Sequence, residues 1–315
     1  MTSTSGTTPA SDGTAGKTGP EVPPREHEGS RSATSGTTPA PTREELVPER
    51  SPRASASVAF RALLLRDLVV LRKNIKEFLP RTLLQPLLLV FVFAYVFPKI
   101  GQSVGGSGAG ASAFSTALVA GVVGLAVIFQ GIQSVALPMV QEFGYTREIE
   151  DRVLAPMPVG LVAFEKVTAG ALYGAVSALL VFPIAAVVPS TPVHLHINWL
   201  LLLTITPLSC FMCGALGLAF GTRFDPRTVP MLFGLIVLPL TMLGCIYYPW
   251  KALESAPWLQ KLVLVNPLVY MCEGFRAALT KGQHMSLWAI YPALIGFLVL
   301  FLWTGLAGFR KRVLT

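Results

Sequence analysis

Residues 114–140 read FSTALVAGVVGLAVIFQGIQSVALPMV, an apolar run without Asp, Glu, Lys or Arg. The run is longer than the roughly 20 apolar residues that a helix needs to cross the hydrocarbon core of a bilayer. Gly121, Gly124 and Gly131 within it offer small surfaces on which other helices can pack closely. The run therefore predicts a transmembrane helix that is surrounded by further helices.

Similar runs recur along the rest of the chain, which is 52% hydrophobic and only 13% charged. Soluble proteins are about one quarter charged, so this composition excludes an ordinary soluble domain. Together with 114–140, the sequence predicts six membrane-spanning helices, the other five being 82–98, 160–188, 199–221, 229–248 and 286–308. We therefore expect an all-α membrane protein that is in contact with membrane lipids.

Basic residues outnumber acidic ones, with a formal net charge of +8. They flank apolar runs instead of alternating with aromatic residues, so nucleic acid is not an expected partner. Most lie on one side of the predicted membrane, in 61–81, 141–158, 222–228 and the FRKR tail at 309–312. Cytoplasmic loops are enriched in Lys and Arg. We therefore expect a multi-pass protein with both termini in the cytoplasm. The high content of Ala, Gly and Pro is typical of a GC-rich bacterium, so the expected location is a bacterial plasma membrane.

The segment 250–280 contains two apolar stretches, each too short to span a membrane alone, separated by Asn266 and Pro267. A seventh span at 261–279 would place Glu273 and Arg276 in hydrocarbon, where charges are costly, and would move the basic tail outside. The sequence instead predicts two short extracellular re-entrant helices. Glu273 and Arg276 have the i,i+3 spacing of an ion pair.

The chain before the first span has two parts. Residues 1–55 are rich in Thr, Ser, Pro and Gly, which predicts a disordered cytoplasmic tail. Residues 56–81 are predicted to form one amphipathic helix at the membrane interface, with an apolar stripe at Leu64, Leu68, Leu71 and Ile75. Residues 82–312 would then be the six-span domain.

The chain offers no convincing ATP site of its own. The sequence GTAGKT at 13–18 resembles the end of a phosphate-binding loop, but Ser11 stands where that motif needs its first glycine. We therefore expect neither catalytic residues nor a cofactor or metal in this chain. The CxxC formed by Cys210 and Cys213 is interpreted as inert packing, because a second such motif is absent from the sequence.

The charged stretch QEFGYTREIEDRVLAPMP, residues 141–158, lies between two predicted spans on the cytoplasmic side. It could be a solvated connector or a docking site for another protein. The spans contain no ionisable group except Glu165 and Lys166, which we expect to reach the cytoplasmic boundary by snorkelling. Carriers driven by protons or sodium usually need such groups deep in the membrane. An energy source outside this chain is therefore favoured.

Four stretches together resemble the permease subunits of ABC type-2 (ABC-2) exporters, over roughly residues 57–312. They are LRDLVVLRKNIKEFLPR at 65–81, LLQPLLLVFVFAYVFP at 83–98, the stretch 141–158, and LVNPLVYMCEGFRAAL at 264–279. The similarity is greatest to bacterial drug-export permeases of the daunorubicin-resistance kind. The resemblance implies two permease copies, identical or paralogous, and two separate ATPase subunits that bind ATP and magnesium.

The resemblance also implies roles for particular residues. The stretch 141–158 would be the coupling helix, with Glu142, Arg147, Glu150 and Arg152 at the ATPase interface. The connecting helix would present Arg66, Arg72 and Lys73 next to it. The substrate would be an amphiphilic drug, a lipid or a polysaccharide, moving between the second and fifth spans of two copies. Residues that could line this path are Phe129, Gln130, Gln133, Met242 and Tyr247.

Two alternative functions are weighed against an ATP-driven permease. A secondary carrier or channel would need intramembrane charge, which the predicted spans lack. A membrane-embedded enzyme such as a lipid-modifying transferase would need a polar or metal-binding cluster, and the outer side offers only His194 and His196.

Overall fold

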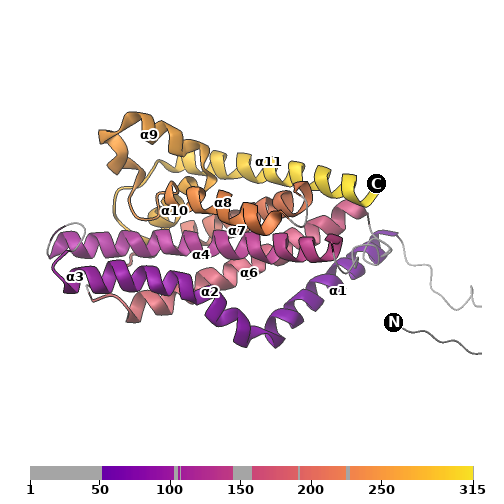
Figure 1. The fold of residues 1–315 in the computed structure, drawn as a ribbon, viewed down its shortest axis with the longest axis horizontal. Coiled ribbons are helices and arrows are strands. Elements are labelled where there is room, and N and C mark those ends of the chain that lie inside the picture. The colour runs from indigo at the N-terminus through magenta and orange to yellow at the C-terminus, as the bar shows by residue number, and fades with distance from the viewer. Residues whose placement is uncertain are drawn as a thin grey trace, which may run out of the picture. The chain divides into compact units, whose positions relative to one another are not determined.

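The fold is known from a computed structural model of the chain, which describes residues 52–102, 106, 108–144, 158–190, 192–224 and 228–314. Within these ranges the structure contains helices and no strand (Figure 1). The elements are α1 (Pro52–Lys73), α2 (Ile75–Val90), the π-helical turn η1 (Phe91–Val96), α3 (Phe97–Lys99), α4 (Ala109–Gly144), α6 (Val159–Val187), α7 (Trp199–Arg223), α8 (Val229–Met242), the 3₁₀ helix η2 (Trp250–Ser255), α9 (Pro257–Leu262), η3 (Val263–Val265), α10 (Pro267–Leu279) and α11 (Leu287–Leu314).

Five helical segments in the described ranges are long and apolar enough to cross a membrane. Each covers all or nearly all of one predicted span, with ends that differ by up to seven residues: Ile75–Lys99, Ala109–Phe143, Val159–Val187, Trp199–Arg223 and Leu287–Val313. Pro257–Val265 and Pro267–Leu279 form a pair bent by 98°, which would make a sixth span if it were counted as one. The chain is therefore an all-helical protein with five to six candidate spans.

The predicted fifth span at 229–248 is shorter in the structure. Helix α8 has 14 residues and ends at Met242, so at 1.5 Å per residue it is about 21 Å long. The chain then turns through Cys245, whose φ of 53° lies in the left-handed region that residues other than glycine rarely adopt. The apolar run continued past the helix end, so composition alone did not mark the turn.

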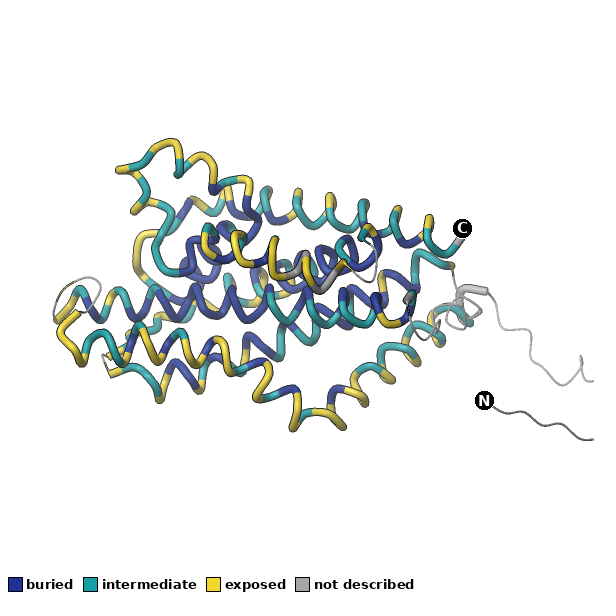
Figure 2. Tube along the Cα trace, viewed as in Figure 1, coloured by how far each residue is buried: buried dark blue, intermediate teal, exposed yellow. Residues whose placement is uncertain are grey.

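Helix α4 lies at the centre of the helical core and packs against α6, α7, α10 and α2. Most residues along α4 and α10 are buried, whereas α1 and α11 show exposed edges (Figure 2). Close packing depends on glycine: a Cβ atom added at Gly131 would lie 2.6 Å from the Cβ of Cys213, and one at Gly214 would lie 2.7 Å from the carbonyl oxygen of Val167. The helix axes approach one another closely at these positions.

The predicted amphipathic helix at 56–81 is divided between two helices. Helix α1 ends at Lys73, Asn74 lies between the two, and α2 continues into the first span with Pro80 inside it. Of the predicted apolar stripe, Leu71 is buried, whereas Leu68 is exposed. The break follows from Asn74, since Asn readily leaves helical geometry and favours turns and helix ends.

The bend between η3 and α10 occurs at Asn266 and Pro267. Asn266 caps α10 because its Oδ1 accepts a hydrogen bond from the backbone nitrogen of Leu268 at 2.9 Å, and Pro267 occupies the first helical position. The Nδ2 of Asn266 also donates to the carbonyl oxygen of Leu240 at 2.6 Å. One side chain therefore starts α10 and fixes it to the end of α8.

Candidate functional site

Three charged side chains join α1, α4 and α6 at the end of α4 from which the stretch 141–158 begins. The Nζ of Lys166 donates to Oε1 of Glu142 at 2.7 Å and lies 3.9 Å from Oδ2 of Asp67. Lys166 and Glu142 are only 4% and 5% exposed. The hydroxyl of Tyr173 also donates to the carbonyl oxygen of Asp67 at 3.3 Å. We call Asp67, Glu142 and Lys166 the basal charge cluster.

The expectation that Glu165 and Lys166 reach the cytoplasmic boundary by snorkelling is wrong, because both side chains are buried. Lys166 stays inside the protein since two carboxylates from other helices neutralise its ammonium group. A buried charge is tolerated when it is paired in this way. The charged residue within an apolar span was itself a signal of a partner, but Asp67 could not be identified as that partner from the sequence.

The predicted ATPase-interface residues are distributed as follows. Arg66, Arg72 and Lys73 are exposed on α1. Glu142 is buried in the basal charge cluster. Arg147, Glu150 and Arg152 lie outside the described residues, so their role stays a prediction.

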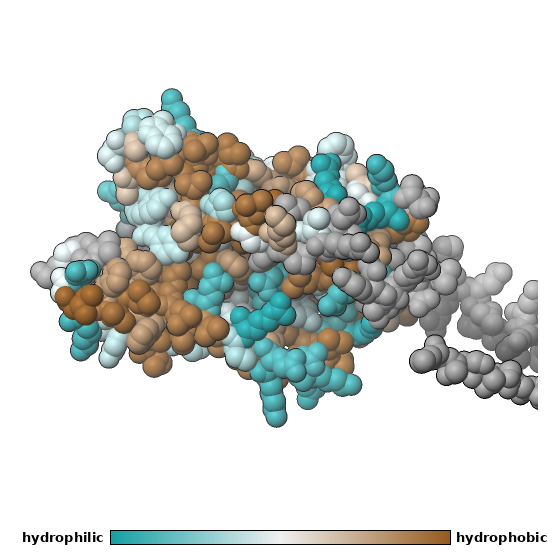
Figure 3. Space-filling model, viewed as in Figure 1, coloured by the Kyte–Doolittle hydropathy of each residue, from teal (hydrophilic) through white to brown (hydrophobic). Residues whose placement is uncertain are grey.

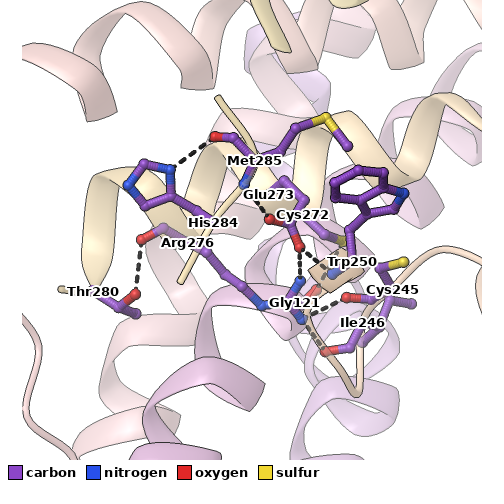
Figure 4. Close-up of polar contacts among 10 residues, drawn as sticks. All are labelled: Gly121, Cys245, Ile246, Trp250, Cys272, Glu273, Arg276, Thr280, His284 and Met285. Atoms are coloured by element: carbon purple, nitrogen blue, oxygen red, sulfur yellow. Dashed lines mark hydrogen bonds and ion pairs between the residues drawn. The ribbon is translucent and has the colours of Figure 1, made fainter. Parts of the chain in front are cut away.

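A second buried charge network lies around Glu273 and Arg276 of α10 (Figure 4). The Nη1 of Arg276 donates to Oε1 of Glu273 at 2.9 Å, an i,i+3 ion pair. The Nη2 of Arg276 donates to the carbonyl oxygens of Cys245 and Ile246, in the turn that follows α8. These bonds hold the strained backbone at Cys245 in place.

The carboxylate of Glu273 binds two further segments. Its Oε1 accepts from the backbone nitrogen of Trp250 at 2.8 Å, and its Oε2 accepts from the backbone nitrogen of Met285 at 2.7 Å. One ion pair therefore connects the end of α8, the start of η2, α10 and the segment before α11 (Figure 4). We call Glu273 and Arg276 the α10 ion pair.

The residues predicted to line a substrate path do not share one cavity. Gln130 and Gln133 on α4 accept hydrogen bonds from the side chains of Thr82 and Arg81 on α2, each at 3.1 Å. Phe129 lies beside them in a small cavity of about 30 Å³. The sequence did not identify Arg81 and Thr82 as their partners, since Arg81 was counted only as a flanking charge.

The two other path candidates lie elsewhere. Met242 is 47% exposed at the end of α8. Tyr247 lines a cavity of about 800 Å³ near the amino-terminal end of α4, together with His194, His196 and Lys281. Ser112 and Thr116 of α4 bind the backbone of the 192–196 segment there.

The described residues contain no group of three or more His, Cys, Asp or Glu side chains that could hold a metal ion. Cys210, Cys213, Cys245 and Cys272 are buried and form no disulfide. The thiol of Cys213 lies 3.7 Å from the sulfur of Met271, a packing contact between α7 and α10.

Comparison with known proteins identifies the family. Residues 58–280 match the family model described as ABC-2 type transporter. The chain is also 29% identical over 186 residues to the inner membrane transport permease YadH of Escherichia coli K12, covering 58% of this chain and 70% of that protein. The same values hold for the YadH proteins of Escherichia coli O157:H7 and Shigella flexneri. The chain therefore belongs to the ABC-2 type transporter family, as a non-catalytic permease subunit.

Proposed function

We propose that this chain is the permease subunit of an exporter in a bacterial plasma membrane, driven by separate ATPase subunits. The similar YadH proteins are named as inner membrane permeases. The daunorubicin-resistance resemblance favours an amphiphilic substrate, with drugs and lipids ahead of polysaccharides. Two permease copies would form the membrane part, and ATP with magnesium would bind to the partner subunits.

The observation that carries this proposal is the basal charge cluster. It connects α1 with the two helices that precede and follow the stretch 141–158. A displacement applied to that stretch, or to α1, would therefore reach α4 and α6 together. Packed helices respond to such a bias by moving as rigid bodies between two arrangements. The ATPase subunits would supply the bias at the cytoplasmic face, and the permease would change its access from inward to outward.

The docking surface can be tested by reversing charge in the stretch 141–158. We expect Arg147→Glu combined with Arg152→Glu to weaken co-purification of the ATPase subunit by at least about tenfold, because charge reversal at an interface sets like charges against one another. The measurement is the ratio of ATPase to permease after affinity purification of the co-expressed complex.

The matched control is Lys281→Glu, a charge reversal at an exposed residue between α10 and α11. This variant should retain the ATPase subunit at the level of the natural chain. Membrane insertion of all variants is checked from their amounts in the membrane fraction. An unchanged ATPase ratio in the double variant, with normal insertion, would show that this stretch is not the docking site.

A further inference from the structure

A groove with a polar part and an apolar part runs along α2. Its polar part, about 390 Å³, lies among α1, α2, α4 and α6 and is lined by residues that include Glu77, Arg81 and Gln133. Its apolar part, about 510 Å³, begins at the same Arg81 and continues along α2 and η1. The apolar lining consists mainly of Leu84, Leu88, Leu89, Val92 and Phe93.

Arg81 provides an anion site at the centre of the groove. One of its terminal nitrogens donates to Oε1 of Gln133 at 3.1 Å, whereas a guanidinium group has five N–H donors. Gln130 accepts from Thr82 through its own Oε1. The bonds described for Gln130 and Gln133 therefore engage their amide oxygens, and their amide nitrogens could donate to a ligand. Among the residues that the structure describes, no carboxylate forms an ion pair with Arg81. Spare donors and an uncompensated positive charge favour an anionic group.

Glu77 provides a cation site at the α1 end of the same groove. It precedes Arg81 by four residues, so the two side chains share a face of α2 and lie about one helical turn apart. Glu77 is exposed and lines the polar part of the groove. It does not form an ion pair with Arg81 in the described part of the chain, and its carboxylate can therefore attract a cation from the ligand.

The order of these features along α2 is acidic, basic, then apolar. Figure 3 shows the change from polar to apolar on the molecular surface: hydrophilic residues gather around the junction of α1 and α2, and hydrophobic residues cover much of the rest of α2. An amphiphile with an alkyl chain, an anionic group next to the chain, and an outer ammonium group would match each part in turn.

We propose that this groove is the loading site of the transported molecule, and that this molecule is a zwitterionic amphiphile. Its ammonium group binds at Glu77, its anionic group binds Arg81 and the amides of Gln130 and Gln133, and its chain lies along the apolar part of the groove. The inference rests on the proposed exporter function and narrows its substrate from amphiphiles in general to those with a phospholipid-like headgroup.

Binding of probe molecules to the permease without its ATPase subunits tests the order of the charged groups along the groove. Three probes share one alkyl chain: dodecylphosphocholine is zwitterionic, dodecyl phosphate is anionic and dodecyltrimethylammonium is cationic. Each competes with a fluorescent phosphocholine lipid for the full chain, purified in an uncharged maltoside detergent. We expect the zwitterion to bind most tightly and the cation most weakly.

Two groove variants should both weaken the zwitterion but differ in their effect on dodecyl phosphate. Arg81→Gln should weaken binding of both phosphate-bearing probes by about tenfold, the loss of a charge-assisted hydrogen bond. Glu77→Gln should weaken the zwitterion but not dodecyl phosphate, because only the zwitterion has an ammonium group. Lys76→Gln, which removes an exposed charge of α2 outside the groove lining, is the control and should bind all three probes as the natural chain does.

Transport by the reconstituted complex separates a substrate from a resident bilayer lipid. Proteoliposomes with the ATPase subunit should move a fluorescent phosphocholine lipid between leaflets when ATP is added, and Arg81→Gln should slow this movement. Equal binding of the probes by the natural chain and Arg81→Gln would overturn the proposal, as would binding without ATP-driven movement in a complex that retains its ATPase subunit. Failure of the exporter proposal would appear separately, as loss of ATPase association with probe binding intact.

Discussion

Single buried charges give this protein its most specific internal contacts. Lys166 connects Glu142 of α4 and Asp67 of α1 from within α6, and all three residues are at most slightly exposed. Removing one partner of a buried pair leaves the other charge without compensation. This lowers the free energy of unfolding more than replacing both partners by apolar residues does. The basal charge cluster should therefore stabilise the fold only while all three of its charged side chains are present.

The change Lys166→Met tests this at the residue scale. We expect it to destabilise the permease by about 3–5 kcal/mol, because the Glu142 carboxylate loses its ammonium partner. The readout is the thermal unfolding midpoint in detergent, which should fall. Adding Glu142→Gln to this variant should restore part of the loss.

The control for this experiment is Lys76→Met, the same substitution at an exposed lysine of α2. It should leave the unfolding midpoint nearly unchanged, since exposed charges contribute little. If the single variant and the double variant unfolded at the same temperature as the natural chain, the cluster would have no stabilising role.

At the scale of elements, α10 is the part of the chain that the other helices hold from several sides. It packs against α4, α7 and α11, and most of its residues are buried. Hydrogen bonds also tie its carboxyl end to the 196–198 segment, because the backbone nitrogens of His196 and Asn198 donate to the carbonyl oxygens of Leu279 and Ala278. The α10 ion pair adds the turn after α8 and the segment before α11.

Glu273→Gln should loosen these connecting segments as well as destabilise the fold. Glutamine keeps the size of the side chain, but Arg276 loses its counter-charge in a buried position, at a cost of about 3–5 kcal/mol. We expect faster proteolytic cleavage within residues 243–256 and a lower unfolding midpoint. The measurement is limited proteolysis of the purified permease followed by mass spectrometry.

Glu254→Gln serves as the matched control, because Glu254 is an exposed carboxylate in η2. Its cleavage rate and unfolding midpoint should equal those of the natural chain. Cleavage of Glu273→Gln at the natural rate would mean that the ion pair does not hold these segments.

At the scale of the whole molecule, the number of crossings depends on α8. Gly221 near the end of α7 packs on Met139 of α4, and the turn after α8 packs on Gly121 of the same helix. These two levels of α4 are about 27 Å apart at 1.5 Å per residue. The chain from the end of α7 to the turn after α8 is therefore long enough to cover most of a bilayer core. With α8 counted as the fifth span, the bent pair of α9 and α10 would be a re-entrant loop.

Six crossings predict opposite sides for His196 and Arg310. We expect a membrane-impermeant maleimide to label His196→Cys in intact cells and to label Arg310→Cys only after the cells are opened. The natural chain is the background control, because its four cysteines are buried. Labelling of both positions, or of Arg310→Cys alone, in intact cells would contradict the six-span arrangement with cytoplasmic termini.

The amino-acid sequence by itself determined the helical class, the approximate spans and the break at Asn266. A bilayer requires long apolar helices, and Asn followed by Pro is a local signal for a helix start, so neither inference needs distant contacts. The resemblance to ABC-2 permeases was also visible in four stretches, and membership of that family is confirmed by the match over residues 58–280.

Only the tertiary structure decided which polar residues meet. The pairing of Lys166 with Glu142 and Asp67, the contact of Arg81 with Gln133, and the end of α8 at Met242 all depend on residues far apart in the chain. Helical periodicity tells which side chains share a face of one helix, but it does not tell which other helix that face will contact. The partners of buried charges were therefore fixed by helix packing, in which each charge must find compensation.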